Sequence, residues 1–340
     1  MNLFITNREI LNEGKANESI RKDGREKAGD NLRYGQFHLE KRKFELFPEP
    51  KERADIAYDN IGNKKAESLM GSARFFTMLY HELCETGRQD VLFFVHGFNT
   101  DLDGVVQNFE VLNRRYVDNP KSPVKHIVIF TWPGKSPKIP LHYYNDARDA
   151  ERSGVALGRA IDSLREFFQY FLNKDNHKPC GQRIHLMLHS MGHRVFQHTI
   201  KENIRGHRTG LQPFHEIFCM AGDVVYNIFE KEYEFNALLD FGERVHVYYH
   251  ENDRVLDISK YTKNFVNMLG RFGRKMKDNS QPFVIDVDVS STKDDEGSGF
   301  QAEFMNHWYY YTSSSVVDDV VLIMDQGEGY ESRGPKRVLN

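Results

Sequence analysis

The stretch that decides the fold is IHLMLHSMGH, residues 184–193. Its first five residues form an apolar run without alternation, which is typical of a strand covered on both faces, as in a parallel sheet. Ser190 follows the run, Gly192 comes two residues later, and apolar residues then recur at helical spacing. The stretch therefore predicts a strand, a sharp turn that lifts Ser190 out of the sheet, and a helix.

Similar apolar runs recur outward from this stretch. They are VLFFV (91–95), IVIFT (127–131), EIFCM (216–220), VHVYY (245–249) and FVIDV (283–287). Helical patterns lie between them, and the clearest covers residues 146–172, where apolar residues stand three and four apart. Strands that alternate with helices predict an α/β fold with a doubly wound, mostly parallel sheet.

The beginning of the chain is more charged than the rest. Two strand-like pieces, 2–6 and 33–38, and an amphipathic helix near 67–85 stand out there. We interpret residues 1–88 as an N-terminal extension of strands and a helix packed on a main domain at 89–325, followed by a C-terminal tail at 326–340. An independent small N-terminal domain is the alternative.

Composition excludes several classes of protein. The 340 residues carry 46 basic and 49 acidic side chains and are 39% hydrophobic, as in ordinary globular proteins. This near balance of charge disfavours bulk binding to nucleic acid. Three cysteines are too few for a disulfide framework, no signal-peptide pattern begins the chain, and no apolar run is long enough for a membrane helix. We expect a cytoplasmic protein without a membrane span.

Functional groups in such sheets gather at the carboxyl ends of the strands. Ser190 stands there as a candidate nucleophile, and the N–H of Met191 can donate to an oxyanion at the start of the next helix. After the run 91–95, Gly97 lets the backbone approach closely, so that the N–H of Phe98 can be the second donor. The alternatives are a helix N-cap at Ser190 and a plain strand-end turn at Gly97.

Two further residues complete a triad. Asp253 follows the run 245–249, and His307 follows a Gly/Ser/Asp-rich loop at 290–299. The order Ser190, Asp253, His307 is the nucleophile, acid and base order of α/β-hydrolases. An imidazole takes the serine proton, and a carboxylate holds the imidazole in the right tautomer.

Other residues compete for the acid and base roles. Asp223 and Asp257 also follow strands, although Asp223 comes one strand earlier and Asp257 lies beyond the expected loop. His250 competes with His307 as the base. Asp253 is the favoured acid, and these alternatives stay open.

Several motifs together resemble a bacterial branch of the α/β-hydrolase superfamily that is catalogued as a domain of unknown function. The resemblance covers residues 88–322 and rests on FFVHGFNT (93–100), FTWPG (130–134), Tyr144 with Asp146, LHSMGH (188–193), HENDRVLDIS (250–259) and His307. Near the start, ITNRE (5–9) resembles a short motif of several members. The resemblance implies an α/β-hydrolase sheet and a serine-hydrolase site at Ser190, Asp253 and His307, and it supplies no substrate.

The surroundings of these residues predict a pocket and no metal. The residues expected to line a substrate pocket are His96, Gly97, Trp132, His189 and Trp308. A zinc site at His189, His193 and His198 is disfavoured, because no carboxylate completes a set of ligands. We expect no cofactor.

The predicted activity is that of a serine hydrolase, carboxylesterase-like, which acts on a small-molecule ester or acyl substrate through an acyl-enzyme. Leu188 departs from the elbow pattern, which has a small residue at that position. We expect the small residues Ser153, Gly154 and Gly158 to leave room for it. The alternative is a weakly active or non-catalytic hydrolase-like binding module.

Overall fold

The computed structural model describes residues 1–22, 28–29, 31–50, 66–85, 89–134, 143–172, 183–205, 211–257, 266–275, 281–293, 306–326 and 336–339. Its strands are β1 (Asn2–Thr6), β2 (Ile10–Leu11), β3 (Ser19–Ile20), β4 (Arg33–His38), β5 (Lys43–Leu46), β6 (Asp90–Val95), β7 (Val124–Thr131), β8 (Ile184–His189), β9 (Phe214–Met220), β10 (Gly242–Tyr249), β11 (Val284–Asp288) and β12 (Lys336–Val338). Its α-helices are α1 (Gly71–Glu85), α2 (Leu102–Leu112), α3 (Tyr143–Leu172), α4 (Gly192–Arg205), α6 (Leu269–Phe272), α8 (Tyr309–Thr312) and α9 (Ser314–Gln326). The segments η2 (Ala66–Ser68) and η4 (Glu234–Asp240) are 3-10 helices, and η3 (Asn113–Val117) is a π-helix.

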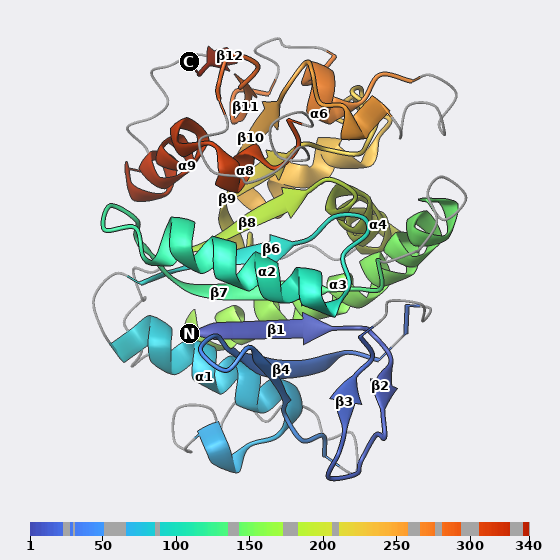
Figure 1. Ribbon diagram of the computed structural model, residues 1–340, viewed down its shortest axis with the longest axis vertical. Coiled ribbons are helices and arrows are strands. Elements are labelled where there is room, and N and C mark those ends of the chain that lie inside the picture. The colour runs from blue at the N-terminus through green and yellow to red at the C-terminus, as the bar shows by residue number, and fades with distance from the viewer. Residues whose placement is uncertain are drawn as a thin grey trace.

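Ten strands form one sheet in the order β12-β11-β10-β9-β8-β6-β7-β1-β4-β5 (Figure 1). Every neighbouring pair from β12 to β1 is parallel, and the pairs β1–β4 and β4–β5 at the other end of the sheet are antiparallel, so that β4 alone runs against the other strands of this sheet. Five of the six apolar runs of the sequence lie in β6 to β10, and the sixth, 283–287, begins one residue before β11. The predicted α/β fold, with a mostly parallel sheet and extra N-terminal strands and helix, is confirmed.

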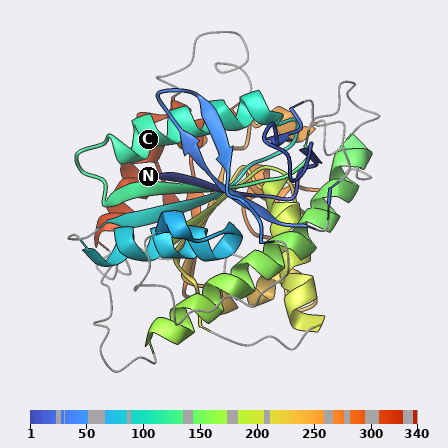
Figure 2. The same cartoon turned by 90° about the horizontal axis from the view of Figure 1, so that it is seen from below.

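Helices cover both faces of the sheet, as Figure 2 shows from below. Residues of α1, α3 and α4 share one apolar core with the sheet, and residues of α2 and α9 share the other. Burial of both faces explains why the central strands are apolar without alternation. No described helix combines the length and the apolar character that crossing a membrane requires.

The first strand lies inside the main sheet. β1 pairs in parallel with β7, and Thr6 stands opposite Thr131, so both strands end at the side of the sheet where the carboxyl ends of the parallel strands lie. At the other end of the chain, β12 adds a strand beside β11. The division into an extension, a main domain and a tail stays a prediction.

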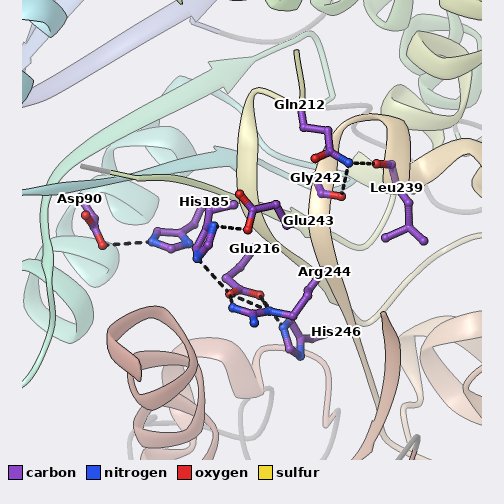
Figure 3. A network of polar contacts seen from close by, with 10 residues as sticks. Asp90, His185, Gln212, Glu216, Leu239, Gly242, Glu243, Arg244 and His246 are labelled. Carbon is purple, nitrogen blue, oxygen red and sulfur yellow. Dashed lines mark hydrogen bonds and ion pairs between the residues drawn. The ribbon is translucent and has the colours of Figure 1, made fainter. Parts of the chain in front are cut away.

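A buried polar network lies at the amino ends of the central strands (Figure 3). The Glu216 carboxylate accepts hydrogen bonds from Arg244 Nε at 3.1 Å and from His246 Nε2 at 2.8 Å. His185 Nε2 lies 3.3 Å from Asp90 Oδ2. All five side chains are buried on strands that the sequence marks as apolar.

Candidate active site

Ser190 occupies the sharp turn between β8 and α4. Its backbone φ is +51°, in the left-handed region that non-glycine residues rarely adopt. The turn is held because the Ser190 N–H donates to the Met220 carbonyl at 3.0 Å and the Ser190 carbonyl accepts from the His193 N–H at 3.1 Å. At Gly192, an added Cβ would lie 2.5 Å from the Val95 carbonyl oxygen. Gly192, the glycine two residues after Ser190, is therefore required by the close crossing of α4 over β6.

His193 supports this turn from the first residues of α4. Its Nδ1 donates to the Ser190 carbonyl at 2.9 Å. Burial lowers the pKa of His193 to about 4, so the ring is neutral at neutral pH. His198, the third histidine of the disfavoured zinc site, lies 3.6 Å from the Glu151 carboxylate. In the described part of the chain, no group of three or more His, Cys, Asp or Glu side chains could hold a metal ion.

Asp253 and His307 form a buried pair, although they stand 54 positions apart. His307 Nδ1 donates to Asp253 Oδ2 at 2.7 Å, and Asp253 Oδ1 accepts from the Leu256 N–H at 3.2 Å. Burial raises the pKa of Asp253, and the contact with His307 opposes that rise. This carboxylate therefore fixes which imidazole nitrogen of His307 carries the proton.

The competing acids and base have other partners. The Tyr143 hydroxyl donates to Asp223 Oδ2 at 2.5 Å. Asp257 forms an ion pair with Arg271. His250 Nδ1 accepts a hydrogen bond from a backbone N–H of its own turn. Among the described contacts, the carboxylate that bonds the His307 ring is that of Asp253.

His189 connects the serine to the Asp253–His307 pair. It precedes Ser190, its ring centroid lies 4.8 Å from that of His307, and its Nε2 donates to the His307 carbonyl at 3.2 Å. Burial lowers the pKa of His189 well below its ordinary value, so it acts here as a neutral donor. Within the described residues, Ser190 and His307 make no hydrogen bond to each other; such bonds often tighten only when substrate binds. The Trp308 ring packs edge-on against His307 at 5.3 Å.

The loop after β6 lies directly against the serine. A Cβ added to Gly97 would lie 2.8 Å from Ser190 Cβ, so any larger residue would push the loop away. The N–H groups of Phe98 and Met191 donate to no acceptor among the described residues. The role of both amides as oxyanion donors stays a prediction.

His96 and Trp132 hold this loop from behind. Their rings stack at 5.3 Å, the Trp132 N–H donates to His96 Nε2 at 3.1 Å, and Trp132 Nε1 donates to the His96 carbonyl at 3.1 Å. Both side chains are buried. They therefore support the loop that carries Phe98, and their contact with a substrate stays a prediction.

Small residues of α3 contact α4 and the segment that follows β1. At Gly154, an added Cβ would lie 2.5 Å from His198 Cβ and 2.6 Å from the Val195 carbonyl oxygen, both on α4. The Ser153 hydroxyl accepts a hydrogen bond from the Asn7 side chain. These contacts show that Gly154 lets α4 approach α3, and the expectation that the three residues make room for Leu188 stays a prediction.

Sequence reasoning missed Arg8, whose guanidinium reaches the loop after β6. A signal was present, because Arg8 stands just beyond a predicted strand, as the other candidates do. It also missed the Tyr143–Asp223 pair, since nothing in the sequence places the start of α3 beside Asp223.

The structure also contains a cavity of about 660 Å³ away from these residues. It is lined by parts of 226–236, Arg274, Lys275 and Gln281, and by none of Ser190, Asp253 or His307. Residues 276–280 lie outside the described residues, as do residues 294–305 of the loop expected before His307.

Comparison with known proteins decides the family. Residues 72–325 match the model of a family described as "Alpha/beta hydrolase of unknown function (DUF900)". The chain belongs to this family. This α/β-hydrolase membership confirms the resemblance predicted from the motifs, and the matched residues begin after β1 and Arg8.

Two further comparisons add little. No functionally curated protein matches this α/β hydrolase in sequence. A solved structure, described as a lipase-esterase related protein from Clostridium acetobutylicum ATCC 824, is 13% identical and aligns over 73% of this chain and 84% of its own, with a TM-score of 0.24. A likeness with so low a score carries no argument about activity.

Proposed function

We propose that this α/β hydrolase cleaves small-molecule carboxylic esters through an acyl-enzyme on Ser190. One observation carries the proposal: the Asp253 carboxylate bonds His307 Nδ1 at 2.7 Å, at the same edge of the sheet as the turn that bears Ser190. A histidine oriented in this way leaves its Nε2 free of a proton and able to accept one.

The reaction follows from these roles. His307 Nε2 takes the Ser190 hydroxyl proton as the oxygen attacks the ester carbonyl. Asp253 stabilises the imidazolium that forms. The N–H groups of Met191 and Phe98 donate to the oxyanion of the tetrahedral intermediate. His307 then protonates the leaving alcohol, and water hydrolyses the acyl-enzyme with His307 again as the base.

A fluorophosphonate probe tests the nucleophile. The wild-type protein should form a covalent adduct on Ser190, and the Ser190→Ala variant should form none. Ser122→Ala is the matched control, because Ser122 is also buried but caps the start of β7 through its bond to the Val124 N–H. It should label as the wild type does.

A panel of esters with short and long acyl chains then defines the substrate. We expect kcat/KM to depend on acyl length in the wild type and to fall by a factor of at least about 10³ in Ser190→Ala. An intact protein that neither labels at Ser190 nor hydrolyses any ester would contradict the proposal and favour the hydrolase-like binding module.

A further inference from the structure

Arg8 brings a buried guanidinium from the N-terminal strand to the candidate site. It stands two residues beyond Thr6, which lies opposite Thr131 in the parallel pair β1–β7. The residue is 2% exposed. Its Nε donates to Thr131 Oγ1 at 2.8 Å, and its Nη2 donates to the Thr100 carbonyl at 2.6 Å. One cation therefore bridges the ends of two strands and the loop after β6.

The Thr131 contact continues to His96. Thr131 Oγ1 accepts from Arg8, so its own proton is free to point at His96 Nε2, 3.3 Å away. That nitrogen carries no proton, because it also accepts the Trp132 N–H. His96 Nδ1 must then carry the ring proton, and it donates to the Gly97 carbonyl at 3.0 Å.

The end of this chain of hydrogen bonds is the peptide group between Gly97 and Phe98. A trans peptide is planar, and its C=O and N–H point in opposite directions. The Gly97 carbonyl is fixed by His96 and by the Thr100 hydroxyl at 3.2 Å. Holding that carbonyl therefore aims the Phe98 N–H, the proposed oxyanion donor, away from His96.

Arg8 fixes the loop at a second point. Its Nη2 holds the Thr100 carbonyl, and the Thr100 N–H donates to the Gly134 carbonyl at 2.8 Å. Burial, and next the charge of Arg8, lower the pKa of His96 to about 3, so the ring stays neutral and keeps the tautomer that the chain of hydrogen bonds requires.

We propose that Arg8 is a positioning residue of the oxyanion hole, which orients the Phe98 N–H through Thr131 and His96 and through Thr100. The proposal rests on the proposed function of Ser190. It assigns a role in the reaction to a residue outside the range that the family model matches. A misplaced Phe98 N–H donates a weaker hydrogen bond to the oxyanion but leaves substrate binding unchanged. Its misplacement is therefore expected to lower kcat and not to raise KM.

Kinetics of Arg8 variants test this role. We expect Arg8→Gln to lower kcat for ester hydrolysis, and the rate of fluorophosphonate labelling, by about 10–100-fold with KM changed less than about threefold. The kcat of Arg8→Lys should lie between those of the wild type and Arg8→Gln, because the lysine ammonium lacks the planar set of N–H donors that reaches both acceptors. Methylguanidine added to Arg8→Ala should restore part of the rate.

Arg165→Gln is the matched control for a lost buried guanidinium. Arg165 donates to the Asn203 side chain at 2.8 Å and to the carbonyls of Leu211 and Asp240, away from the site. Its removal should lower the melting temperature without slowing the labelling of Ser190. The pair of variants separates loss of stability from loss of positioning.

Two further measurements keep the test decisive. Thr131→Val should slow labelling and Thr131→Ser should restore it, even where Arg8→Gln fails to fold. The ¹H–¹⁵N signal of the Phe98 amide should move in Arg8→Gln and stay in place in Arg165→Gln. Labelling of Arg8→Gln and Thr131→Val within twofold of the wild type would overturn the proposal.

The two proposals fail differently. A wild-type protein that forms no Ser190 adduct contradicts the proposed function, and an unchanged Phe98 amide signal in Arg8→Gln then contradicts the positioning role as well. A Ser190 adduct that forms at the same rate in wild type and variants contradicts the role of Arg8 alone.

Discussion

Replacing Glu216 with Gln measures how much the network at the amino ends of the strands stabilises the protein. Burial alone would raise the pKa of Glu216, but hydrogen bonds from His246 and Arg244 outweigh it and lower the pKa from 4.5 to about 2. A shift of this size is worth about 3 kcal/mol, at about 1.4 kcal/mol for each pKa unit. Removing one partner of a buried ion pair costs about 3–5 kcal/mol in other proteins, so the two routes agree. We expect Glu216→Gln to lose about 3 kcal/mol of unfolding free energy at pH 7.

The sign of the pH dependence follows from the lowered pKa. A carboxyl whose pKa is depressed by folding stabilises the protein fully above its unfolded pKa, and this stabilisation is lost as the pH falls toward the folded value. The gap between wild type and Glu216→Gln should therefore be about 1 kcal/mol smaller at pH 4 than at pH 7. Urea denaturation followed by circular dichroism at both pH values measures the gap.

Glu243→Gln is the control for this experiment. Glu243 lies 2.8 Å from His215 in the same region, but its side chain is 55% exposed. An exposed pair of this kind contributes less than about 1 kcal/mol. The reasoning is refuted by a Glu216→Gln variant that loses no more free energy than Glu243→Gln, or by a gap that is equal at pH 4 and pH 7.

Three further predictions concern the candidate site. Asp253→Asn should lower kcat by about 10⁴-fold, since the amide holds His307 in the wrong tautomer, and steady-state kinetics at pH 7 checks this. Gly97→Ala should lower the rate of Ser190 labelling by at least about tenfold, because its Cβ would lie 2.8 Å from Ser190 Cβ; an unaffected rate would contradict this contact. The His96 ring should show no protonation between pH 8 and pH 5, because burial lowers its pKa to about 3; a midpoint near 6.5 in ¹⁵N NMR would count against its buried contacts.

Much of the sheet could be predicted because burial on both faces leaves a simple signal. The runs 91–95, 184–188 and 245–249 are apolar throughout or nearly so, and each lies within its strand. The strand β12 carried no such signal, because Lys336–Val338 is a short and mostly exposed edge strand. An edge strand can be held by backbone hydrogen bonds alone, so its side chains need show no apolar pattern that would predict a strand.

The burial and the partners of polar residues inside the apolar runs could not be predicted from the sequence. Glu216 begins the run 216–220 and His185 stands within 184–188, yet both side chains are fully buried. A sequence read along one strand gives no means of knowing that Arg244 and His246 stand on the neighbouring strand. Pairing across the sheet decides whether such a charge is solvated or buried, and pairing depends on register.

The candidate site divides in the same way. Asp253 and His307 were predicted from their places after strands, and the structure joins them by a hydrogen bond of 2.7 Å. Their role in catalysis stays a prediction that the labelling experiment tests. Arg8 was missed because its partners lie about 90 and 120 residues away, at Thr100 and Thr131.

Asp253 and His307 could be predicted and Arg8 could not, because of the way in which a sequence encodes an oxyanion hole. Its donors are backbone N–H groups, which every residue except proline has, so the residue types at Phe98 and Met191 specify nothing by themselves. What the sequence must specify is the set of side chains that orient the peptide: His96, Thr131 and Arg8. Under this proposal, substitutions at those three positions alter the reaction more than substitutions that change only the side chain of Phe98, although Phe98 supplies the hydrogen bond to the oxyanion.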